Sequence, residues 1–192
     1  PEVIYHDVRE RILSGRLAPG QPVRQDALAA DLGVSKIPLR EALTRLEHDG
    51  LVAANPRRGY EVKALTAAEA EEVFDLRLSV EPAAAALGAR AATDADRAAA
   101  TAALAALDAE LEAGGPRVSE LNRAFHMALV APAGRPLTAA LVDRLHTLAD
   151  RYVRAHLEPA GRPQRAHDEH ADLLAAWTSG RADDVEVGLS EH

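Results

Sequence analysis

The chain has 192 residues, of which 47% are hydrophobic, so it holds enough apolar side chains for one large folded domain or two small ones. It contains no cysteine, which excludes disulfides, thiolate nucleophiles and cysteine-based zinc sites. No stretch is long and apolar enough to cross a membrane and no secretory signal opens the sequence, so we expect a cytoplasmic protein without a membrane partner.

The net charge of −8 is unevenly distributed along the chain. Residues 1–64 carry ten basic and nine acidic side chains, whereas residues 65–192 carry twelve and twenty-one. The acidic excess therefore belongs to the second part. A near-neutral first part can still bind nucleic acid if its basic residues share one face.

The first part has the pattern of a helix-turn-helix followed by a β-hairpin. Apolar periodicity and turn residues predict, in chain order, a helix over 3–14, a loop over 17–22, a short helix over 26–32, a helix from Ser35 to about 48, and strands over 51–54 and 60–62. Gly33 lies in the tight turn between the second and third helices, and Ser35 is the expected N-cap. The hairpin is expected to form a wing.

From Thr66 onward, Ala and Leu recur at helical spacing and no strand pattern appears. The predicted helices cover 66–91, 94–113, 117–131, 136–157, 163–178 and 181–192. Pro82 lies inside the first of them, where we expect a kink or a break. The fold class is therefore mainly α, with a winged helix-turn-helix over 1–64 and an all-helical domain over 65–192.

Basic residues gather where a helix-turn-helix meets DNA. The N-terminal residues of its second helix lie nearest the base edges, and here Lys36 and Arg40 share one helix face. The predicted contacts to bases or phosphates are Arg24, Ser35, Lys36, Ile37, Arg40, Arg57 and Arg58. Each basic side chain alone is more often a solvated surface charge, but five converging on one expected surface favour DNA binding.

The run from Val34 to Leu43, continued by 45–47, 50–52 and 57–59, resembles the DNA-binding domain of GntR-family regulators, as does the earlier segment 12–20. The resemblance implies double-stranded DNA as a partner and adds Arg45 and Gly59 to the DNA-binding residues. Lys36 stands where the family usually has Arg, and Ile37 where it usually has Thr. These departures leave the operator sequence open.

The second domain contains a candidate metal site. Asn122 and His126 lie four residues apart and so project from one face of a helix, while His170 and His192 come from other predicted helices. Three imidazoles and one oxygen suit a divalent ion such as Zn, Ni or Mn, with positions left open for a ligand. From spacing alone, however, three scattered histidines are more often surface or core residues.

Phe125-His126, Glu169-His170 and His192, together with 72–77 and Glu81, resemble the FCD ligand-binding domain of the FadR subfamily of GntR regulators. In that family a divalent metal is held by a His, by an Asp or Asn four residues before it, and by two later His, and the metal in turn binds a small carboxylate effector. The resemblance thus implies a metal held by Asn122, His126, His170 and His192, although an amide is a poorer ligand than a carboxylate.

Arg77 is the candidate to bind an effector carboxylate, because guanidinium and carboxylate pair through two hydrogen bonds. An ion pair with Glu81, one helical turn later, is an equally expected role. His146 is a lesser candidate, for which we prefer an ordinary surface position.

These patterns predict a homodimeric repressor that binds a palindromic operator and is released by a small carboxylate. One alternative is a regulator that senses the metal ion directly. A metal-dependent enzyme is the less favoured alternative, since no Asp or Glu can be singled out as a general base and catalysis needs no winged helix. We therefore do not expect an enzyme.

Overall fold

The computed structural model describes residues 2–56, 58–64, 66–156 and 162–192. Their contacts divide the chain into two units, each with its own hydrophobic core. The first unit comprises Pro1–Glu71 and Thr147–Leu157, and the second comprises Glu72–His146 and Glu158–His192.

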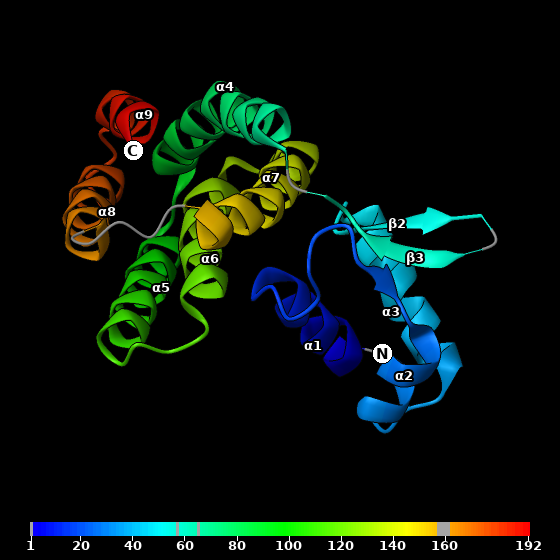
Figure 1. Cartoon of the computed structure of the whole chain (residues 1–192). Helices are drawn as coiled ribbons and strands as arrows, with labels where there is room; N and C mark the ends of the chain where they lie inside the picture. The colour runs from blue at the N-terminus through cyan, green and yellow to red at the C-terminus, as the bar shows by residue number, and fades with distance from the viewer. Residues whose placement is uncertain (1, 57, 65, 157–161) are drawn as a thin grey trace. The chain divides into compact units, whose positions relative to one another are not determined.

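The first unit is a winged helix-turn-helix (Figure 1). Its elements are α1 (Glu2–Leu13), β1 (Pro22–Val23), α2 (Gln25–Asp31), α3 (Lys36–His48), β2 (Val52–Asn55) and β3 (Gly59–Val62). In the sheet β3 lies between β1 and β2 and is antiparallel to both. The predicted helices and the predicted wing are confirmed.

The core of this unit forms where α1 packs on α3 and the sheet closes one side. Its fully buried residues include Val8, Leu39, Leu43, Leu46 and Leu51. The turn between α2 and α3 depends on Gly33, whose φ of 63° is a left-handed conformation that side chains rarely adopt. Ser35 then takes an extended N-cap conformation at the start of α3.

Two local features differ from the sequence predictions. The predicted loop over 17–22 ends in β1, which pairs Pro22 with Glu61 and Val23 with Tyr60. Two residues are too short to show a strand period, so only the pairing partner reveals it. At Pro82, where the sequence predicts a kink or a break, α4 continues without a break. Pro82 is buried, and as a proline it supplies no N–H to the helix.

The second unit is all-helical in its described residues. The helices of this half are α4 (Ala67–Ala91), α5 (Asp94–Glu112), α6 (Val118–Val130), α7 (Pro136–His156), α8 (Arg162–Thr178) and α9 (Ala182–Glu191), with a 3₁₀ turn at Ala131–Ala133. The first residues of α4 and the last part of α7 belong to the first unit. At the start of α5, Thr93 and Asp96 form a reciprocal capping box.

Trp177 and Phe125 are the largest fully buried side chains of the second unit. The indole Nε1 of Trp177 donates to the carbonyl oxygens of Ala85 and Leu129, both at 3.1 Å. This contact joins α8 to α4 and α6, and two of these helices, α6 and α8, carry candidate metal ligands. None of the helices in the described parts of the chain is both long and apolar enough to cross a membrane.

Candidate DNA-binding surface and metal centre

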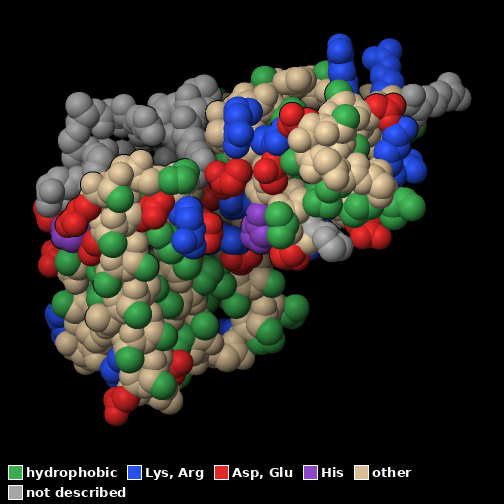
Figure 2. All heavy atoms as spheres, turned by 90° about the horizontal axis from the view of Figure 1, so that it is seen from below, with side chains coloured by type: hydrophobic (Ala, Val, Ile, Leu, Met, Phe, Trp, Pro, Cys, Tyr) green, Lys and Arg blue, Asp and Glu red, His purple; other side chains and the backbone are tan. Residues whose placement is uncertain are grey.

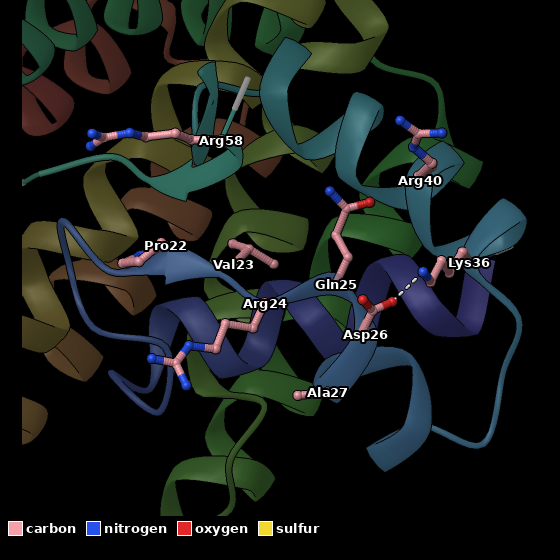
Figure 3. Close-up of a pocket in the computed structure, with 9 residues that line it drawn as sticks. All are labelled: Pro22, Val23, Arg24, Gln25, Asp26, Ala27, Lys36, Arg40 and Arg58. Atoms are coloured by element: carbon pink, nitrogen blue, oxygen red, sulfur yellow. Dashed lines mark ion pairs between the residues drawn. The ribbon is translucent and has the colours of Figure 1, made fainter. Parts of the chain in front are cut away.

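A basic groove of about 670 Å³ opens on the first unit between the start of α2, the first turns of α3 and the wing. Its lining brings together four cationic residues predicted to contact DNA, namely Arg24, Lys36, Arg40 and Arg58 (Figure 3). Figure 2 shows Lys and Arg side chains projecting from the part of the chain that carries the wing. The groove therefore presents a positive surface to a polyanion.

One carboxylate lies inside this groove. Asp26, in the first turn of α2, forms an ion pair with the amino group of Lys36 (Figure 3). Both side chains are mostly exposed, so the contribution of this pair to stability is small. Its effect is to direct Lys36 toward α2, while Arg40 extends from the next turn of α3.

The other predicted DNA-binding residues are placed differently. Arg45 lies outside the groove lining, where its guanidinium pairs with Glu2 and stacks at 4.3 Å from the centre of the Tyr5 ring. Gly59 has a φ of 84° at the start of β3, a left-handed conformation that favours glycine. Ser35 and Ile37 are exposed at the start of α3. Arg57 lies outside the described residues.

Three histidines predicted as metal ligands meet in the second unit. One nitrogen atom from each of His126 on α6, His170 on α8 and His192 after α9 lies within 4.8 Å of the other two. The ring centres of His170 and His192 are 4.7 Å apart, and those of His126 and His170 are 5.4 Å apart. The fold thus brings together side chains separated by up to 66 positions in the sequence.

Two carboxylates orient the rings of His126 and His192 in this cluster. The Nδ1 atom of His126 contacts Glu81 Oε1 at 2.7 Å, and Nδ1 of His192 contacts Glu169 Oε2 at 2.8 Å. A carboxylate on Nδ1 fixes the tautomer with its proton there and leaves Nε2 as a lone-pair donor. Carboxylates that contact zinc-binding histidines impose the same arrangement.

Three buried nitrogens of the cluster have no hydrogen-bond partner among the described residues. They are Nε2 of His126 and both ring nitrogens of His170. Burial lowers the pKa of His126 to about 4 and that of His170 to about 2, so both rings are neutral near pH 7. Buried polar atoms without partners are rare, and neutral imidazole nitrogen is the form that binds a metal.

A second cluster adjoins the first and shares His126. Glu81 Oε1 also contacts Nε2 of His146 at 2.9 Å, while Glu81 Oε2 accepts from Nε of Arg77 at 3.1 Å. Burial opposes ionisation of Glu81, but the facing His126 and His146 hold the pKa of Glu81 well below its usual value. With a guanidinium and two imidazoles on one carboxylate, this cluster is better suited to supporting the first than to holding a second cation.

His146 is 1% exposed, so the surface position preferred for it from the sequence is wrong. Its position on α7, with no motif around it, gave no sign that it faces Glu81. The expected ion pair between Arg77 and Glu81 is present. Asn122 lies half-buried on α6, one turn before His126, as the spacing predicts.

Comparisons with known proteins agree with this architecture. Residues 2–62 match the model of the gntR family of bacterial regulatory proteins, and residues 72–192 match the FCD domain. The YdhC regulator of Bacillus subtilis (strain 168) is 36% identical over 77 residues, which cover 40% of this chain and 34% of that protein. The repressor GlaR of Escherichia coli (strain K12) is 29% identical over 90% of this chain and 82% of its own.

Among solved structures, McbR/YncC of E. coli superposes with a TM-score of 0.81, at 24% identity, over 98% of this chain and 90% of its own. This likeness shows the fold. The chain spans only about a third of YdhC but more than four fifths of GlaR. The family matches make the protein a regulator and not an enzyme. The chain belongs to the gntR family of bacterial regulatory proteins and carries an FCD domain after its DNA-binding domain.

Proposed function

We propose that this regulator is a transcription repressor whose FCD domain holds a divalent metal ion and through it a small carboxylate effector. The observation that supports the metal most strongly is the donor set. Nε2 of His126 and the nitrogens of His170 are buried without partners among the described residues, beside His192. Neutral imidazoles suit Zn, Ni or Mn, and three of them leave coordination positions open.

The fourth protein ligand in this proposal is Asn122, whose amide oxygen is a weaker donor than a carboxylate. We expect the ion to bind less tightly than at a site with Asp in this position. The effector's carboxylate completes the coordination, and Arg77 is its proposed second contact. An effector carboxylate on Arg77 competes with Glu81 for the same guanidinium, and through Glu81 this competition reaches the contact that orients His126.

The DNA-binding face in this proposal is the groove around Lys36 and Arg40. A homodimer, in the manner of the FadR subfamily that the sequence resembles, presents two such grooves to a palindromic operator. Effector binding at the metal shifts the population of domain orientations and releases the operator. The relative GlaR of Escherichia coli is a transcriptional repressor, which supports repression as the proposed mode of this chain.

Metal binding is tested by loading the chelator-treated protein with Zn, Ni or Mn and measuring bound metal by elemental analysis. We expect about one ion per chain. His192→Ala, at a partly exposed site, and His170→Ala should both reduce the occupancy strongly. The matched control is His167→Ala on the same helix as His170, since His167 is partly exposed and pairs with Asp108. Equal occupancy in all four proteins contradicts the metal site.

Operator binding then separates the effector proposal from direct metal sensing. The metal-loaded protein is mixed with DNA selected from a random library, and a panel of small carboxylic acids is added. Release by an acid only in the metal-loaded form supports the proposal. Loss or gain of DNA binding on chelation alone, with no response to any acid, favours a regulator that senses the metal itself.

A further inference from the structure

The recognition helix α3 presents one large apolar side chain to solvent. Ile37 is 72% exposed in the first turn, although it is β-branched and hydrophobic. Single exposed apolar residues are common on protein surfaces, so exposure alone carries no argument. The argument comes from where Ile37 lies on the helix and from what surrounds it.

The core fixes the orientation of α3. Leu39, Ala42, Leu43 and Leu46 are buried, and successive residues of an α-helix turn by about 100°. The side directly opposite this buried face carries Ile37, Glu41, Thr44 and His48, all of which are exposed. Of the four, Ile37 lies in the first turn, which is the part of a recognition helix that comes closest to the base edges.

The other outward residues of α3 are less suited to reading a base there. The hydroxyl of Thr44 lies within hydrogen-bond distance of the Arg40 carbonyl, at 3.0 Å, and of the Tyr60 hydroxyl, at 3.1 Å. Glu41 lies a full turn further along the helix, and His48 lies at its C-terminal end. Basic side chains flank Ile37 on the same helix, because Lys36 precedes it and Arg40 follows it in the lining of the groove. This charge pattern matches duplex DNA as the occupant of the surface.

The chemistry of Ile37 restricts what it can recognise. Its side chain neither donates nor accepts a hydrogen bond, so it cannot read the polar pattern of a base pair. The apolar feature of the major groove is the C5-methyl group of thymine, which cytosine lacks. We propose that Ile37 is a specificity-determining residue that selects a thymine by contact with its methyl group. This inference rests on the proposed binding of operator DNA and is independent of the metal site.

The test changes both partners: it removes the methyl group of thymine from the DNA, and it shortens the side chain of Ile37 in the protein. Wild-type protein first selects duplexes from a random library, and each thymine of the consensus is then replaced in turn by deoxyuridine. Binding is measured by fluorescence anisotropy. At one thymine of each recognised half-site we expect the substitution to weaken wild-type binding about fourfold, the effect of losing one buried methyl group.

The Ile37→Ala variant should bind thymine and uracil at that position equally, while Ile37→Val keeps most of the discrimination. Val3→Ala removes a comparably exposed apolar side chain from α1 and serves as the matched control, with the wild-type pattern expected. The inference is overturned if wild-type protein tolerates uracil at every position, or if Ile37→Ala shows the same loss as wild type. Failure to select any sequence refutes operator binding itself.

Discussion

Gly88 and Gly188 provide a matched pair of substitutions that tests the helix packing of the second unit. Both glycines lie inside helices, in α4 and α9. A Cβ atom added at Gly88 would lie 2.0 Å from the carbonyl oxygen of Leu129 on α6, which is backbone and cannot move aside alone. A Cβ at Gly188 would meet its nearest neighbour, a methyl of Leu173, at an ordinary 4.0 Å.

These distances predict opposite effects on the free energy of unfolding. Overpacking typically costs about 1–3 kcal/mol, and separating α4 from α6 also disturbs the carbonyl of Leu129 that accepts from Trp177, worth about 1 kcal/mol more. Alanine regains up to about 1 kcal/mol from helix propensity at either position. We therefore expect Gly88→Ala to destabilise the protein by about 2–3 kcal/mol and Gly188→Ala to be neutral or slightly stabilising.

Urea unfolding followed by tryptophan fluorescence measures this difference directly. The chain has one tryptophan, Trp177, which is fully buried in the second unit, so its emission reports the unit that contains both glycines. The slope of the unfolding free energy against urea should be unchanged in both variants. If the two variants differ in stability by less than about 0.5 kcal/mol, the close approach of α4 to α6 is wrong.

Three further predictions follow from the described contacts. Glu81→Gln should weaken zinc affinity about 10- to 100-fold, because the amide no longer fixes the His126 tautomer. Competition with a chromophoric chelator measures the affinity, and an unchanged value would show that Glu81 does not support metal binding. Arg45→Ala should change DNA affinity by no more than about twofold, since Arg45 pairs with Glu2, whereas Arg40→Ala should lower DNA affinity about tenfold. Equal losses in the same anisotropy assay would contradict the assignment of the groove as the DNA-binding surface. In metal-free protein the pKa values of His126 and His170 are lowered, so as the pH falls these residues take up protons in the unfolded chain before they do so in the folded chain. The free energy of unfolding is therefore complete above about pH 6.5 and falls by roughly 2 kcal/mol per histidine by pH 5. Urea titrations across this range should show that His170→Asn halves the dependence, and a flat profile would show that these rings are not buried as neutral groups.

The groove and the histidine cluster place opposite demands on the two parts of the chain. DNA binding needs exposed cations whose charges attract phosphates, and here these lie on a unit with nearly balanced charge. A metal ion held by imidazoles needs neutral donors, and burial keeps His126 and His170 in that form. The second part carries the acidic excess, and acidic side chains repel phosphates, so the charge distribution favours the first part as the DNA-binding part.

The sequence alone determined the order and type of nearly all the helices, the wing and the recognition helix, because helical periodicity, glycine turns and N-caps are local signals. It also singled out the three histidines that meet in the second unit, although through resemblance more than through spacing. It did not reveal β1, whose two residues become a strand only through β3.

Only the tertiary structure decided which polar groups face one another. The roles of Glu81 and His146 depend on α4, α6 and α7 meeting around one carboxylate, and no spacing along the chain encodes that contact. The pairing of Arg45 with Glu2 likewise depends on α1 packing against α3. Local propensities specify each helix separately, whereas burial, pKa and hydrogen-bond partners are properties of the packed assembly of helices.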